Sequence, residues 1–197
     1  MKLYRPATVT VGVLFVLLGG LTRLAAPDQV YGEDNRAIVH GTIGETLTYG
    51  GSQVTVTRMK FVKSLRARES DEDVVESNGI FVAIEYDTVR GTPDPPSNDA
   101  TLVADGGSVY APVAQVIADG FDFAEPGFGK TGALVFEVNP ADLSGLTLKV
   151  RTIRFFTVLA EDLAVDLGVP DETIAQQHID KADAEYVLPK SVTRVAE

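Results

Sequence analysis

Apolar residues alternate with polar ones in several segments after residue 37. Leu146, Leu148 and Val150 are each separated by one polar or basic residue. The same spacing recurs at Leu134, Phe136 and Val138 and at Leu163, Val165 and Leu167. A repeat of two residues places alternate side chains on opposite faces of a β-strand. These segments are therefore predicted to be strands with one buried face and one solvent-facing side.

One segment interrupts its own alternation. Val54 and Val56 occupy even positions, whereas Met59 and Phe61 occupy odd positions. A β-bulge inserts one extra residue into a strand and so returns a shifted apolar set to the same face. We therefore expect a bulge near residues 57–58.

A further segment is apolar at both odd and even positions. Residues 80–86 read IFVAIEY, which is typical of a central strand that is covered on both sides. Turn-forming stretches rich in Gly, Pro, Asn, Asp and Ser separate the strands, for example at 49–52, 91–99 and 105–108. Roughly seven short strands with such turns predict an all-β fold, an antiparallel β-sandwich.

The start of the chain has a different pattern. Residues 6–22 carry no charged side chain, with Lys2 and Arg5 before them and Arg23 after them. A transmembrane helix needs about 17 to 25 apolar residues, and positive charge before it favours a cytoplasmic N-terminus. We therefore expect residues 1–27 to form a short cytoplasmic start and a transmembrane signal-anchor.

A cleaved secretory signal is the alternative for this segment. Ala25 and Ala26 are small residues of the kind found at cleavage sites. Leu24 is large for such a site, Arg23 is close to it, and Pro27 would follow the cut. The uncleaved anchor is therefore favoured. Both alternatives place the rest of the chain outside the cytoplasm. The favoured anchor predicts a single-pass protein of the cell membrane.

The outer part divides into three segments by pattern. Residues 28–37 are polar and are interpreted as a linker, and residues 38–168 contain the strand signals. In residues 169–197, Pro170 and two acidic residues predict the start of a helix that ends near residue 184. The sandwich is thus expected to carry a C-terminal helix followed by an extended tail.

The extended tail, residues 186–195, cannot fold alone. It either adds to an edge of the domain's own sheet or docks on another chain. Because the sandwich pattern ends near residue 168, we expect docking, and we expect truncation after residue 168 to leave the sandwich folded. The candidate partner-binding residues are Tyr186, Val187, Leu188, Val192 and Val195.

Composition and charge exclude several classes of protein. The 197 residues include no cysteine, which excludes disulfides, thiolate metal sites, cysteine nucleophiles and a lipid-modified cysteine. The net charge of −11 argues against nucleic acid as a partner, because phosphates repel an acidic surface.

Three stretches carry a family resemblance: GETLTYGGSQVTVTRMKF at 44–61, GIFVAIEY at 79–86 and GALVFEV at 132–138. Together they resemble the telokin-like, immunoglobulin-like extracytoplasmic domain family of unknown function from Gram-positive and actinobacterial surface lipoproteins. The resemblance covers about residues 38–168 and implies an immunoglobulin-like β-sandwich with a non-catalytic envelope role. Asn139 departs from the family's Phe-Glu-Val-Pro turn, and the N-terminal helix would replace the missing lipid anchor.

No motif in the sequence has the neighbouring structure or partner residues that its catalytic chemistry would need. Residues 124–131 (AEPGFGKT) fit a relaxed phosphate-binding loop, yet a strand rather than a helix is predicted to follow. His40 and His178 are the only histidines, and no Gly-x-Ser-x-Gly motif is present. We therefore expect no catalytic, cofactor-binding or metal-ligating residues and a protein that is not an enzyme.

An aromatic loop at residues 120–129 (GFDFAEPGFG) offers a second candidate surface. Phe121, Phe123 and Phe128 would anchor a partner if they were exposed, since large apolar side chains dominate interface energies. The alternative is that they cap an open end of the sandwich, and this alternative is favoured because an exposed trio would promote aggregation.

These observations favour a membrane-anchored accessory or assembly subunit of an envelope membrane complex, either a transporter or a respiratory assembly. Such a subunit would act by protein–protein interaction with an integral membrane partner. The alternative is an extracytoplasmic module that binds a small solute, glycan or lipid under the aromatic loop.

The anchor can be tested on the mature protein. If residues 6–26 remain attached, the mature chain starts at Met1 or Lys2 and stays with membranes in alkaline carbonate. N-terminal sequencing and carbonate extraction measure this. A mature N-terminus at or after Pro27 would instead establish a secretory signal.

Overall fold

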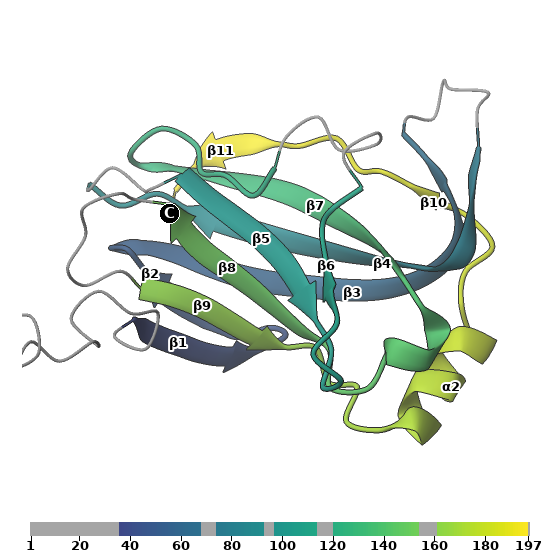
Figure 1. The fold of residues 1–197 in the computed structure, drawn as a ribbon. Coiled ribbons are helices and arrows are strands. Elements are labelled where there is room, and N and C mark those ends of the chain that lie inside the picture. Colours follow the sequence, from purple (N-terminus) through teal and green to yellow (C-terminus); the bar gives the residue numbers. More distant parts are fainter. Residues whose placement is uncertain (1–35, 68–73, 93–96, 114–119, 154–160, 197) are drawn as a thin grey trace, which may run out of the picture. The chain divides into compact units, whose positions relative to one another are not determined.

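The computed structural model describes residues 36–67, 74–92, 97–113, 120–153 and 161–196. The expected membrane segment at residues 1–27 and all but the last two residues of the 28–37 linker lie outside these ranges. Within the described ranges, no helix has the length and apolar character needed to cross a membrane. Residues 37–197 form one unit, in which two β-sheets face each other (Figure 1).

The first sheet has five strands in the order β1-β9-β8-β5-β6. Its strands are β1 (Ala37–Thr42), β9 (Glu161–Asp166), β8 (Thr147–Ile153), β5 (Ser97–Val103) and β6 (Val109–Tyr110). The second sheet has the order β10-β3-β4-β7-β11, and a short strand β2 also pairs with β3. Its strands are β2 (Thr46–Tyr49), β3 (Ser52–Arg66), β4 (Val75–Val89), β7 (Phe128–Val138), β10 (Tyr186–Val187) and β11 (Thr193–Val195).

The main core lies between the two sheets and confirms the predicted alternation. Leu148 and Val150 on β8 are fully buried, whereas Lys149 between them is exposed. Phe136 on β7 is also fully buried in this core. The β-sandwich predicted from the period of two is therefore confirmed.

The predicted bulge in β3 is present. The register of β3 against β4 shifts between Val56 and Arg58. As a result, Val54 and Val56 before the shift and Phe61 after it all belong to the same core. The extra residue thus compensates for the change of parity that the sequence shows.

Strand β4 lies in the middle of its sheet and is buried on both faces. Ile80, Val82 and Ile84 point into the main core, whereas Phe81 and Ala83 belong to a second cluster on the outer face. The remaining buried members of that cluster are Val62, Leu65, Val135 and Tyr186. The prediction of a central strand covered on both sides is confirmed.

The C-terminal tail completes the outer cluster and both edges of the second sheet. Strand β10 pairs in parallel with β3, and β11 pairs antiparallel with β7 at the opposite edge. The chain between them crosses the outer face, where Leu188 packs against the second cluster (Figure 1). Of the two alternatives for the tail, the structure therefore has addition to the domain's own sheet. The expectation that the tail docks on another chain rather than on its own sheet is therefore wrong for β10 and β11.

Ion pairs attach the segment just before the tail and the far end of the tail to the second sheet. Lys60 and Arg66 on β3 pair with Asp183 and Glu185 at 3.0 and 2.9 Å. Near the other end, Arg194 forms an ion pair with Asp87 on β4. Each exposed pair contributes ~1 kcal/mol or less, so the buried apolar contacts dominate.

Two strand pairs are parallel, which the expectation of a purely antiparallel sandwich missed. These are β1 with β9 and β10 with β3. Both lie at sheet edges and join segments that are far apart in the sequence. A long connection permits parallel pairing, whereas a tight hairpin permits only antiparallel pairing.

The predicted C-terminal helix is present but shorter than expected. Helix α2 (Glu172–Asp180) begins after Asp171, whose side chain accepts a hydrogen bond from the Ile174 amide at 2.9 Å. Lys181 follows it as the C-terminal cap, so the helix ends before residue 184. The chain then joins β3, where the Asp183 amide donates to the Phe61 carbonyl at 2.9 Å. A separate 3-10 turn, η3 (Pro140–Asp142), is capped by the Asn139 side chain.

The tail is predicted to be necessary for stability, contrary to the expectation from the sequence alone. Tyr186→Ala removes a large buried ring and should lower the free energy of unfolding by roughly 3–5 kcal/mol. Val192→Ala changes a side chain that is 55% exposed and should cost less than about 0.5 kcal/mol. Urea denaturation of the full chain in detergent measures both. Equal midpoints for the two variants would contradict the covering role of the tail.

Candidate functional site

Among the described residues, the outer face of the five-stranded sheet lies outside both buried clusters. The described residues form two buried clusters, one between the sheets and one on the outer face of the second sheet. Neither cluster includes the outer face of the first sheet. Its outward residues include Ile38, His40 and Lys149, all exposed, and Ile38 is 53% exposed. We call this surface the open face.

Strand register arranges the open face in rows across β1, β9 and β8. His40 on β1 is opposite Ala164 on β9, which is opposite Lys149 on β8. In the row on one side, Asp162 lies between Ile38 and Arg151. In the row on the other side, Asp166 lies between Thr42 and Thr147. Residues in one row stand side by side on the same face of the sheet.

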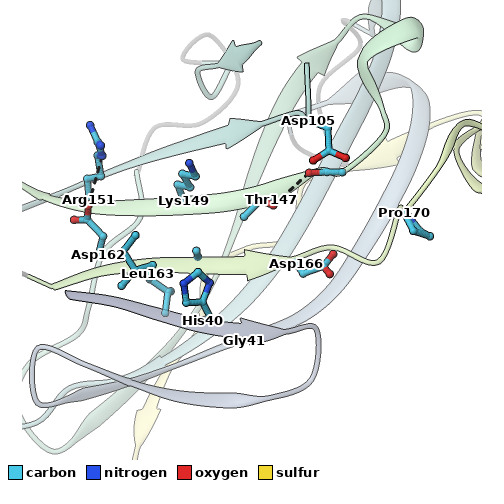
Figure 2. Close-up of a pocket in the computed structure, with 13 residues that line it drawn as sticks. His40, Gly41, Asp105, Thr147, Lys149, Arg151, Asp162, Leu163, Asp166 and Pro170 are labelled. Carbon is cyan, nitrogen blue, oxygen red and sulfur yellow. Dashed lines mark hydrogen bonds and ion pairs between the residues drawn. The ribbon is translucent and has the colours of Figure 1, made fainter. Parts of the chain in front are cut away.

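These rows enclose a groove of about 640 Å³. Figure 2 shows the groove with His40 rising from β1 on one side and Lys149 from β8 on the other. Ala164 lies between them in the register, and its side chain ends at a methyl group. The two long side chains therefore flank a low point in the surface.

The charge of the lining side chains changes from one end of the groove to the other, along the strand direction. Its basic side chains, His40, Lys149 and Arg151, lie toward one end, and Arg151 is 3.6 Å from the Asp162 carboxylate. Asp105 and Asp166 line the other end (Figure 2). Asp162 is only 7% exposed, so its charge is directed mainly toward Arg151. The arrangement presents a positive and a negative end within one groove.

A glycine forms the acidic end of the groove. Gly145 has a φ of +66°, a backbone conformation that residues with a side chain rarely adopt. Its amide donates a hydrogen bond to the Val169 carbonyl at 2.7 Å. A Cβ at this position would overlap the carboxylate of Asp105. The missing side chain therefore lets Asp105 lie over the turn just before the start of β8.

The aromatic loop lies elsewhere and mostly faces inward. Phe121 is 5% exposed, and its ring is 4.7 Å from the ring of Tyr86. Phe123 contacts Phe121 edge-on at 5.7 Å and packs against the main core. Phe128 is 39% exposed at the start of β7. The first two rings thus cap the core, and none of the three phenylalanines lines the groove.

The tail candidates differ in exposure. Tyr186 is buried, and its hydroxyl donates to Glu85 at 2.8 Å. Burial raises the pKa of the Tyr186 phenol, and this hydrogen bond raises it further. Leu188 packs against the outer cluster, whereas Val187, Val192 and Val195 are exposed. Val195 is paired in register with Phe128, so two candidates from separate sequence segments meet at this edge. Their role in partner binding stays a prediction.

Lys130, from the segment that resembles a phosphate-binding loop, and His178 both contact other side chains of the domain. Lys130, in the segment resembling a phosphate loop, lies on strand β7 and donates to Asp122 at 2.7 Å. His178 stacks on Phe61 with ring centres 4.8 Å apart; burial lowers its pKa, as does the nearby charge of Lys181. Within the described ranges, no three His, Cys, Asp or Glu side chains are grouped so that they could hold a metal ion.

The groove was not predicted from the sequence. Alternation placed Lys149 and Arg151 on a solvent-facing side, which is correct, but it did not identify the strands beside them. The parallel pairing of β1 with β9, which brings His40 into the same row, has no local sequence signal.

Comparisons with known proteins leave the family open. No family model matches the chain, and no curated protein matches it. Among solved structures, the chain is similar to an uncharacterized β-sandwich protein from Clostridium difficile 630, with 11% sequence identity and a TM-score of 0.43. The match covers 68% of this chain and 97% of that one.

The role of Gly145 gives a test of the acidic end. Gly145→Ala should lower the free energy of unfolding by more than about 1 kcal/mol, because it adds backbone strain and a clash with Asp105. In Gly145→Ala with Asp105→Ala the clash is removed and only the strain remains. The double variant should therefore be more stable than Gly145→Ala alone in thermal denaturation. If Asp105→Ala gives no such recovery, the carboxylate does not lie over Gly145.

Proposed function

We propose that this protein is a membrane-anchored extracytoplasmic accessory subunit that docks, through its open face, on an integral membrane protein of the cell envelope. The observation that carries the proposal is the difference between the two outer faces. The chain covers much of the apolar outer face of the second sheet with its own tail, whereas the open face remains accessible and hollowed by a groove.

The edge of the open face also favours docking. Strand β1 is an edge strand whose residues are exposed or half-buried, and it is the first strand after the expected linker. An edge strand offers main-chain hydrogen-bonding groups to a partner, and a neighbouring groove can accept the partner's side chains. Together they give one continuous surface on which main-chain and side-chain contacts can be made.

We further propose that the sandwich is immunoglobulin-like, as the sequence resemblance implies. The connections from β4 to β5, from β6 to β7 and from β7 to β8 each pass from one sheet to the other. Such repeated crossing is characteristic of immunoglobulin-type sandwiches. Together with the sequence resemblance, this connectivity supports the proposed location outside the cytoplasm.

Capture of a small solute or glycan is the second candidate, and the groove itself favours it. Its volume lies within the ~300–1,000 Å³ of typical ligand pockets. Such pockets are mostly apolar and enclosed, whereas this groove is rich in charged side chains and open along the sheet. Protein docking is therefore preferred over a small ligand.

Site-specific cross-linking in native membranes distinguishes these functions. A photoreactive p-benzoylphenylalanine replaces Ile38 on the open face, Val192 on the tail, or the exposed Gln53 on β3 as a matched control. We expect Ile38→p-benzoylphenylalanine to give a cross-link to an integral membrane protein and the Gln53 variant to give none. Cross-links only from the Val192 variant would show that the partner binds the tail and not the open face. No protein cross-link at Ile38 would overturn docking through the open face.

A further inference from the structure

The groove has an unneutralised positive centre in an acidic protein. Among the described residues, neither the His40 ring nor the Lys149 ammonium has a hydrogen-bond or ion-pair partner, although Arg151 beside them lies near Asp162. Elsewhere on the described surface, Arg58, Lys60, Arg66, Lys130 and Arg194 all lie within ion-pair distance of a carboxylate. Lys63 is exposed without an ion pair to any described residue, but it does not line the groove. The chain has a net charge of −11, so acidic side chains outnumber basic ones, yet none in the described part of the chain pairs with Lys149.

We propose that the groove binds an extended peptide segment of the partner that carries an acidic residue and, two positions away, a basic residue. This inference rests on the proposed docking function. The acidic side chain lies between His40 and Lys149 over Ala164, and the basic side chain lies between Asp166 and Asp105.

The width of the central row suits one carboxylate. Neighbouring strands are about 4.8 Å apart, so the backbones of β1 and β8 are separated by about 10 Å across β9. A carboxylate that accepts a hydrogen bond of ~2.8 Å from each side fits within this width when both side chains lean inward. A larger residue in place of Ala164 would fill the space.

The length of the groove sets the spacing of the two ligand charges. Ala164 and Asp166 are two residues apart on β9, as are Lys149 and Thr147 on β8. Two residues of extended chain span about 6.6 Å, and in an extended peptide the side chains at positions i and i+2 project from the same face. The distance between the positive and negative rows therefore matches an acid-x-base sequence.

The same polarity sets the direction and selectivity of binding. A peptide with two acidic residues would place one beside Asp105 and Asp166, and like charges at such positions disfavour the complex. A peptide with two basic residues would meet Lys149. The groove thus selects one sign at each end rather than charge in general.

The test measures binding of short peptides to the full chain in detergent micelles at low salt. The probes are fluorescein-labelled peptides with the central sequences Glu-Thr-Lys, Glu-Thr-Glu and Lys-Thr-Lys, and sodium acetate as a free carboxylate. We expect Glu-Thr-Lys to bind about tenfold more tightly than the other two peptides, and binding to weaken as salt is raised. Acetate should not compete at the concentrations that block with unlabelled Glu-Thr-Lys.

A charge exchange makes the assignment specific to the central row. Lys149→Glu should reduce Glu-Thr-Lys binding by about tenfold and make Lys-Thr-Lys the preferred peptide. Lys63→Glu makes the same charge change at an exposed position on the other sheet and should leave all affinities unchanged. Ala164→Leu should block binding of Glu-Thr-Lys. Because Ala164 is only 6% exposed, the melting temperature of this variant is measured as well, to show that the variant is folded.

The outcomes separate this inference from docking itself. Equal affinity for the three peptides, loss in Lys63→Glu as large as in Lys149→Glu, or competition by acetate alone would each overturn the acid-x-base site. A cross-link from position 38 to a membrane protein together with any of these results would retain docking and reject only the peptide chemistry.

Discussion

Burial of strand β4 on both faces is the constraint on which the rest of the structure depends. A strand with apolar side chains on both faces must be shielded from water on both sides. The five-stranded sheet can shield only one face of β4. The second cover is the C-terminal tail, which crosses the outer face and pairs at both edges of the sheet. The tail and the ion pairs that attach it follow from this requirement, whereas α2 packs against the main core through Ala175.

Self-covering on one side also makes the two outer faces of the sandwich different. The outer face of the second sheet is partly occupied, and two of the three loop phenylalanines are used to cap the core. On the open face, strand register rather than a loop fixes the positions of the outward side chains. Side chains placed by a sheet are held more precisely than side chains on a loop.

The sequence was informative wherever the structure depends on local pattern. Alternation predicted the buried residues of β7, β8 and β9, the shift in parity predicted the bulge at residues 57–58, and Asp171 was correctly placed near the start of a helix. The extent of the tail's pairing could not be predicted, because a short apolar segment has the same pattern whether it covers its own domain or another. The groove was missed because its central row joins His40 to Ala164, and no local signal reports parallel pairing between distant segments.

The pairing of β1 with β9 also affects how the sandwich can form. These two strands lie near opposite ends of the domain sequence, so their contact closes a loop that contains most of the chain. Loop-closure entropy makes such contacts late and slows folding. A chain that emerged N-terminus first would hold β1 unpaired until β8 and β9 had formed. The open face, and the groove with it, would therefore be among the last parts of the protein to exist, so that a partner recognising this surface would bind only fully folded copies.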